Sequence, residues 1–154
     1  MKEPFMILEE LIQRYPSLEG CKEDIQKAYE ALADCFSKGG KVLICGNGGS
    51  AADAEHMVGE LMKGYLKKRE LSQEIKDRLE QAHPDMGPYM AGKLQGALPA
   101  IALSAHTALA TAFSNDVDAD LVFAQQVLGY GKKGDVLIGF STSGNASNVL
   151  YAFY

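Results

Sequence analysis

Apolar residues recur every three or four positions through residues 5–36, a spacing typical of helices that bury one face. Pro16 interrupts this pattern, and two glycines follow its second half. The apolar positions are Phe5, Leu8, Leu11, Ile12 and Tyr15 in the first half, and Ile25, Ala28, Tyr29, Leu32 and Phe36 in the second. Residues 1–40 are therefore expected to form an N-terminal helical segment.

The pattern then changes to short, continuous apolar runs at 42–45, 98–103 and 136–140. Each run is followed by small polar residues and then by a return to helical spacing. Uninterrupted apolar runs are typical of strands buried on both faces of a parallel sheet. Three strand–loop–helix units predict an α/β fold, a doubly wound parallel sheet with right-handed crossovers and three strands in this chain.

The segment 66–96, between the first two units, is longer than an ordinary connection. Leu71, Ile75 and Leu79 predict an amphipathic helix, with Ser72 near its start. The groups His83-Pro84-Asp85 and Met86-Gly87-Pro88 predict turns. We interpret the segment as a helical insertion at the surface; a lid or an oligomer contact is the alternative.

The last residues, 149–154, are apolar and resemble the beginning of a helix that faces a core. Three strands are also fewer than the roughly five or six of an average sheet. The sequence therefore predicts that residues 1–154 are a single domain that is incomplete at its C-terminus.

The composition of the chain bears on whether it binds nucleic acid or a membrane. The net charge is −5, from 15 basic and 20 acidic residues, which argues against a nucleic-acid-binding surface. No segment approaches the roughly 20 apolar residues of a membrane span, and the N-terminus has no signal-peptide pattern. Three cysteines without ligand spacing suit thiols in a reducing compartment. We expect a cytoplasmic protein that binds neither nucleic acid nor membrane.

Two of the loops contain the strongest candidate chemistry. The loop after the first strand consists of Gly46, Asn47, Gly48, Gly49 and Ser50, and the loop after the third consists of Ser141, Thr142, Ser143, Gly144 and Asn145. Backbone N–H groups at the start of a helix, together with hydroxyl donors, favour a phosphate group. Because no lysine follows as in nucleoside triphosphate loops, a phosphate monoester on a sugar is the better candidate.

Two other readings of these loops are weaker. Residues 46–51 satisfy the G-x-G-x-x-A pattern of dinucleotide-binding loops, but the acidic residue expected about 20 positions later, at the end of a second strand, is missing. We therefore expect no nucleotide cofactor. The G-x-S-x-G pattern of serine hydrolases fails around Ser141, because Ser143 stands at its last glycine.

The helix after the first loop contains Asp53, His56 and Glu60. His56 and Glu60 are one turn apart and share a face, so they could hold a divalent metal or place a carboxylate over a substrate. Pairs of this kind are more often solvated helix-face contacts. Their position beside a phosphate loop favours the functional interpretation.

The run 39–50, with Asp53, His56 and Glu60-Leu61, resembles the first half of a phosphoheptose isomerase of the SIS (sugar isomerase) domain family. Residues 134–145 with Asn148-Val149 are similar to that family's second phosphate loop, and Asn115-Asp116 matches a further element. The resemblance covers most of the chain outside 66–96. It implies the flavodoxin-like SIS fold.

The resemblance also implies roles for individual residues. Both loops would bind the substrate phosphate, chiefly through Ser50, Ser141, Thr142 and Ser143. Glu60 would be the acid–base residue, His56 and Glu60 would be zinc ligands, and Asp116 would lie near the sugar. The family forms tetramers with active sites between subunits, so a homo-oligomer is expected.

The chain departs from the family at two places. Ala146 stands where the family often has a further hydroxyl residue, and the family's C-terminal helix, with a glutamine and a catalytic histidine, is absent.

Two functions remain open. The first is a phosphosugar isomerase that converts a ketose phosphate to an aldose phosphate, with sedoheptulose 7-phosphate and D-glycero-D-manno-heptose 7-phosphate as the expected pair. The alternative is a non-catalytic SIS module that binds phosphosugars or a protein partner, either regulatory or associated with a replication initiator. Glu60 with His56 favours the isomerase, whereas the missing C-terminal helix favours the binding module.

Overall fold

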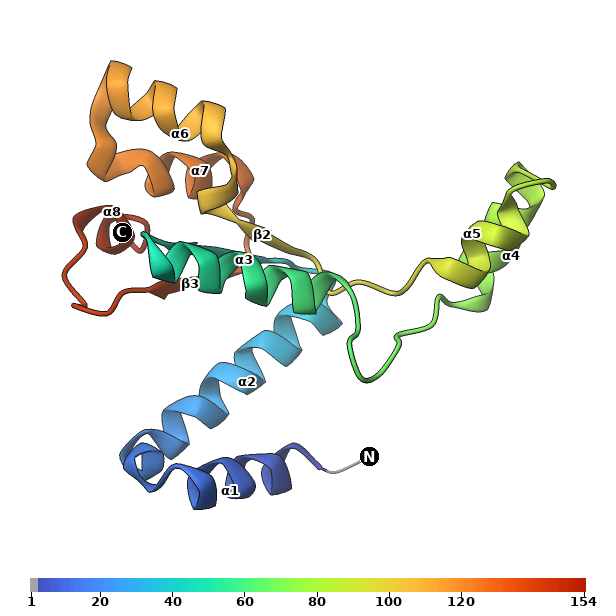
Figure 1. Cartoon of the computed structure of the whole chain (residues 1–154), viewed down its shortest axis with the longest axis horizontal. Coiled ribbons are helices and arrows are strands. Elements are labelled where there is room, and N and C mark those ends of the chain that lie inside the picture. The colour runs from blue at the N-terminus through green and yellow to red at the C-terminus, as the bar shows by residue number, and fades with distance from the viewer. Residues whose placement is uncertain (1–2) are drawn as a thin grey trace.

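A parallel sheet of three strands forms the centre of the computed structural model, which describes residues 3–154 (Figure 1). The strands are β1 (Val42–Gly46), β2 (Ala100–Ala102) and β3 (Val136–Phe140). Their order is β2-β1-β3, so the chain crosses from one side of β1 to the other between the second and third strands. The predicted doubly wound α/β sheet is confirmed in these strands.

Both faces of the sheet are covered, because alternate side chains of β1 point in opposite directions. Leu43 and Cys45 lie in a cluster with residues of α7 (Val122–Tyr130) and α8 (Ser147–Tyr151). Val42 and Ile44 lie in a second cluster on the other face, together with side chains of α2 (Lys22–Ser37) and α3 (Gly49–Met62). The side chain of every β1 residue from 42 to 45 is at most 2% exposed. This burial explains the uninterrupted apolar run in the sequence.

The N-terminal segment is helical, as predicted. It consists of α1 (Pro4–Arg14), the 3₁₀ helix η1 (Pro16–Cys21) and α2. Pro16 falls between the two α-helices, at the start of the 3₁₀ turn. Gly40 then brings the chain close to Cys35, where an added Cβ would lie 2.8 Å from the cysteine Sγ. The glycine therefore allows the chain to pass tightly from α2 into β1.

The segment 66–96 contains two helices that pack on each other and stand away from the sheet (Figure 1). They are α4 (Gln73–Ala82) and α5 (Gly87–Lys93). Ser72 caps α4 by accepting a hydrogen bond from the Ile75 N–H at 3.4 Å. A turn is present at residues 84–86, as predicted for 83–85, but it ends at Met86, because Gly87 and Pro88 begin α5. A proline in the first turn of a helix loses no intrahelical hydrogen bond.

Arg69 ties the base of this helical arm to the body. Its side chain donates to the Leu61 carbonyl at 2.6 Å and to the Gly96 carbonyl at 2.9 Å. The Gly96 N–H donates in return to the Arg69 carbonyl at 2.7 Å. The two ends of the arm are therefore held together beside the C-terminal end of α3.

The second unit differs most from its prediction. β2 has three residues rather than the six of the apolar run, because Leu103 already belongs to the 3₁₀ turn η2 (Leu103–Ala105). The expected helix is present as α6 (Thr107–Phe113), but it continues through the π-helical turn η3 (Ser114–Asp118) and the 3₁₀ turn η4 (Ala119–Leu121) into α7. Helix α7 was not predicted from the sequence.

Among residues 3–154, no helix combines the length and the apolar character needed to cross a membrane.

Asp135 anchors the beginning of β3 to the beginning of β1. Its carboxylate accepts hydrogen bonds from the backbone N–H groups of Lys41 at 2.9 Å and Lys132 at 2.8 Å, and it forms an ion pair with the Lys41 side chain. Burial alone would raise the pKa of the Asp135 carboxyl. The hydrogen bonds and the Lys41 charge outweigh burial and hold this pKa below its ordinary value.

Replacing Asp135 with asparagine should destabilise the fold in a pH-dependent way. A lowered folded-state pKa stabilises the protein fully above the unfolded-state pKa of about 3.9 and is lost as the pH falls through the folded value. Asp135→Asn should therefore lower the free energy of unfolding by about 1–3 kcal/mol near neutral pH and by progressively less below about pH 4. Urea denaturation at a series of pH values measures both effects.

The exposed Asp85, which has no hydrogen bond or ion pair to any residue in 3–154, provides the matched control as Asp85→Asn. An equal loss at neutral and acidic pH would show that the charge of Asp135 is not the source of its effect.

Candidate functional site

The loop after β1 brings a strand end and a helix start into close contact. An added Cβ at Gly46 would lie 2.7 Å from the Ser50 carbonyl oxygen, so only glycine fits this approach. Gly48 has a φ of +55°, a conformation that other residues rarely adopt. α3 begins at Gly49, and no hydrogen bond within residues 3–154 uses the N–H groups of Gly48 and Gly49 or the Ser50 hydroxyl. These three groups are available as donors to an anion.

The loop after β3 is ordered by its own hydroxyl groups. The Ser141 Oγ accepts from the Gly144 N–H at 3.1 Å, and the Ser143 Oγ accepts from the Asn145 N–H at 3.2 Å. Gly144 has a φ of +69°, a backbone conformation that favours glycine, and the chain turns at this residue. A hydroxyl that accepts a backbone hydrogen bond still has its own O–H to donate. Both serines can therefore hold the loop in shape and donate to a ligand.

A reciprocal amide pair joins the first loop to the start of α8, directly after the second loop. The Asn47 Nδ2 donates to the Asn148 Oδ1 at 2.8 Å, and the Asn148 Nδ2 donates to the Asn47 Oδ1 at 3.0 Å. The loops are neighbours because β1 and β3 pair along their full length, with Gly46 opposite Phe140. In such sheets, ligands bind where the strand order reverses, which is between β1 and β3 here. The candidate site is therefore the pair of loops connected by Asn47 and Asn148.

His56 and Glu60 are exposed on α3, and they differ in their distance from the first loop. Glu60 is one turn beyond His56 and lies about 15 Å along the helix axis from Ser50. Its carboxylate is 3.7 Å from the Lys63 Nζ, an exposed ion pair that contributes little to stability. Nearer the sheet, the Glu55 carboxylate accepts from the Ser104 hydroxyl at 3.3 Å. Within one copy of the chain, Glu60 and the loops are well separated.

Asp116 lies in the π-helical turn η3 and is exposed. Its carboxylate accepts from the neighbouring Asn115 Nδ2 at 2.8 Å. No hydrogen bond within residues 3–154 connects it to either loop.

The described residues offer neither a complete metal site nor an activated thiol near the loops. No group of three or more His, Cys, Asp or Glu side chains within 3–154 is close enough to hold an ion. His56 and Glu60 by themselves supply two donors, whereas a zinc ion takes about four ligands. Cys45 directly precedes the first loop, but its burial raises the pKa of the thiol to about 11. It stays protonated near neutral pH and is a packing residue.

Comparison with known proteins agrees with this arrangement. A family model described as the SIS domain matches residues 9–76, which include the first loop and α3. The solved phosphoheptose isomerase of Neisseria gonorrhoeae superposes with a TM-score of 0.59 at 32% identity, covering 96% of this chain and 67% of that chain. The chain belongs to the SIS domain family. A phosphoheptose isomerase from Francisella tularensis superposes with a TM-score of 0.63 at 28% identity, over 95% and 67% of the two chains.

Related sequences bear the same name. The phosphoheptose isomerase of Campylobacter jejuni serotype O:6 is 43% identical over 132 residues, which are 86% of this chain and 57% of the relative. That of Desulfovibrio desulfuricans is 42% identical over 121 residues, which are 79% and 45%. This SIS chain thus spans about half the length of these relatives. It is related to phosphoheptose isomerases over the part that it spans.

The structure adds one residue to those proposed from sequence. Asn148 was noted only as part of a motif, and its hydrogen bonds to Asn47 make it the direct link between the loops. This contact could not be predicted from local sequence, since the two residues are 101 positions apart. The side-chain amide of Asn47 is occupied by this pair. Asn47 would therefore contribute to ligand binding by fixing the shape of the first loop.

Removing the amide pair should loosen both loops without unfolding the sheet. Asn148→Ala eliminates both hydrogen bonds, each worth about 0.5–1.5 kcal/mol. We expect amide hydrogen exchange of residues 50–52 and 144–145 to accelerate by about 3- to 10-fold per lost bond. Exchange in β2 should stay unchanged. Asn115→Ala, which removes an asparagine bonded only to its neighbour, is the control. Equal acceleration in both variants would contradict the assigned link.

Proposed function

We propose that this chain is the phosphosugar-binding part of an aldose–ketose isomerase of the phosphoheptose isomerase type. The main support for this proposal is the arrangement of the two loops. Two loops with free donors, N–H groups in the first and hydroxyls in both, lie side by side at the reversal point of the sheet. Relatives that share 42–43% of their residues with the chain are phosphoheptose isomerases by name.

The loops suit a phosphate monoester because they supply donors and no cation. The N-terminus of α3 adds the positive end of the helix dipole, which attracts an anion. Ser50, Ser141, Thr142 and Ser143 provide hydroxyls, and Gly48 and Gly49 provide N–H groups. Asn145 shapes the second loop by donating from its Nδ2 to the Ser143 carbonyl at 2.9 Å. Together these groups would hold the phosphate end of the sugar.

Isomerisation requires one base that moves a proton between C1 and C2 of the sugar. A carboxylate removes the proton from the carbon beside the carbonyl and returns it to the other carbon, while a second proton moves between the two oxygens. Glu60 is our proposed base, and Asp116 our proposed contact to the sugar. Because Glu60 is about 15 Å along α3 from Ser50, the base would be supplied to these loops by a second copy of the chain. The proposed unit is therefore a homo-oligomer, a tetramer by resemblance to the family.

Where zinc is bound, we propose that His56 and Glu60 are two of its ligands. Within residues 3–154 these two side chains do not complete a site. The proposed substrate pair is sedoheptulose 7-phosphate and D-glycero-D-manno-heptose 7-phosphate, which rests on the names of the relatives.

A non-catalytic binding module is the second candidate. The separation of Glu60 from the loops favours it, as does the ion pair of Glu60 with Lys63. Such a module would use the same loops for a phosphosugar and would need no base. The two candidates differ in what Glu60 does.

Removing the loop hydroxyls should weaken phosphosugar binding under either candidate. Ser141→Ala with Ser143→Ala removes two charge-assisted hydrogen bonds, each worth on the order of 1.5–3 kcal/mol. Affinity for sedoheptulose 7-phosphate should fall by at least about 10-fold per lost bond, measured by titration calorimetry. Ser17→Ala changes an exposed serine whose hydroxyl forms no hydrogen bond in 3–154, and it should bind as the parent does. Unchanged affinity in the double variant would exclude these loops as the phosphate site.

Glu60→Gln separates the two candidates, because it keeps the shape of the side chain and removes the base. If the protein is an isomerase, turnover should fall by about 100-fold or more while substrate affinity stays within about twofold. Conversion of the ketose phosphate, followed by NMR, gives turnover, and calorimetry gives affinity. Glu74→Gln on the arm is the matched control. A parent protein that binds the sugar phosphate without converting it would support the binding module.

A further inference from the structure

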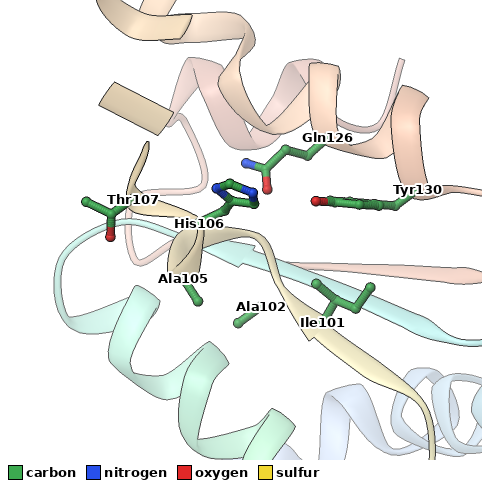
Figure 2. Close-up of a pocket in the computed structure, with 7 residues that line it drawn as sticks. All are labelled: Ile101, Ala102, Ala105, His106, Thr107, Gln126 and Tyr130. Carbon is green, nitrogen blue, oxygen red and sulfur yellow. The ribbon is translucent and has the colours of Figure 1, made fainter. Parts of the chain in front are cut away.

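A hollow with an apolar floor and a few polar side chains lies beside β2, the strand at the edge of the sheet away from β3. Its volume is about 470 Å³, and it opens between the outer edge of β2, the turn η2 and helix α7. The lining residues are Ile101, Ala102, Ala105, His106, Thr107, Gln126 and Tyr130. Figure 2 shows the His106 ring, the Gln126 amide and the Tyr130 hydroxyl directed toward one another above Ile101 and Ala102. The volume of this cavity is within the roughly 300–1,000 Å³ of small-molecule sites, and it is widely open to solvent.

Gln126 contributes a buried hydrogen-bond acceptor that has no partner. The side chain is 2% exposed, and its Oε1 is the only buried side-chain oxygen or nitrogen within 3–154 without a hydrogen bond. The orientation of the amide is fixed, because its Nε2 donates to the Leu103 carbonyl at 3.0 Å and to the Val122 carbonyl at 3.2 Å. A flipped amide would place oxygen against two carbonyls. The wall of the cavity therefore contains a buried oxygen that lacks a donor.

The surrounding polar groups complement this acceptor. The His106 Nδ1 accepts from the Leu109 N–H at 3.3 Å, so the neutral ring has its proton on Nε2 and can donate it. The hydroxyls of Thr107 and Tyr130 form no hydrogen bond within residues 3–154, and each can donate and accept. No Asp, Glu, Lys or Arg side chain lines the cavity. A ligand there meets one obligatory acceptor, several hydroxyl-type partners and no formal charge.

We propose that this cavity binds a neutral polyhydroxylated molecule, a sugar or polyol without phosphate. Its hydroxyl groups would donate to the Gln126 Oε1 and exchange hydrogen bonds with His106, Thr107 and Tyr130. Its C–H surface would lie on Ile101, Ala102 and the Tyr130 ring, which give the cavity an apolar floor. A charged ligand would gain no ion pair here and would lose its hydration.

The cavity and the loops use different residues. β1 lies between β2 and β3, and neighbouring strands are about 4.8 Å apart, so the cavity is one strand spacing from the loop after β1 and two from the loop after β3. None of the loop residues lines it. The inference therefore does not depend on the proposed isomerase activity.

Saturation-transfer NMR with unphosphorylated D-mannose and D-fructose tests the proposal on the whole chain. We expect transfer to both sugars and a shift of the Gln126 side-chain amide signal. Tyr130→Phe removes one exposed hydroxyl and should weaken binding by about fivefold or more. Gln126→Met has a similar shape without the acceptor and should reduce binding further. Tyr151→Phe, a partly exposed tyrosine outside the cavity, should bind as the parent does.

The proposal would be overturned by absence of transfer from both sugars, by unchanged binding in Tyr130→Phe, or by displacement of the sugars by inorganic phosphate, which would place them at the loops. Since Tyr130 lies at the surface, its variant gives a result even if Gln126→Met fails to fold. Finding the Gln126 Oε1 bonded to an ordered water in a sugar-soaked crystal would likewise contradict sugar binding.

Discussion

The position of β1 between β2 and β3 determines where the chemistry of this molecule lies. β1 is buried on both faces and paired on both edges, so the loop at its carboxyl end starts from a fixed position. Because β3 pairs beside it in parallel, the second glycine- and serine-containing loop must emerge next to the first. The two loops thus meet through the hydrogen-bond register of the sheet, and the Asn47–Asn148 pair then holds them together.

Helix α3 has two ends that differ in chemistry. Its N-terminus contributes free N–H groups to the loops, whereas its C-terminal turn contains Glu60 and is capped by Arg69, which donates to the Glu60 and Leu61 carbonyls. The helix length therefore separates the anion-binding groups from the proposed base within one copy. The same Arg69 holds the base of the α4–α5 arm, so the arm and the Glu60 end of α3 share one anchor.

The sequence was sufficient for features that depend on local patterns. The apolar runs gave three strands, Pro16 and Ser72 marked helix boundaries, and the two loops were identified by composition. Features that depend on tertiary contacts were missed. Gly87 and Pro88 suggested a turn, but packing of Gly87 against Leu79 and Glu80 allows a helix to begin there. Gln126 is polar, and its burial in α7 could not be predicted from the sequence. The burial depends on two carbonyl groups, those of Leu103 and Val122, that accept hydrogen bonds from its amide.

The Asn47–Asn148 pair has a consequence for the order of folding. Its two residues are separated by 101 positions, and they can meet only after β1 and β3 have paired across the intervening chain. Closing so long a loop is entropically costly, and contacts of this kind delay the folding of α/β domains. The pair should therefore form late, after the helices and after the first strand contacts. In a partly folded chain the two loops would not yet lie side by side. A ligand that needs both loops would therefore bind only the folded sheet and stabilise it relative to its precursors.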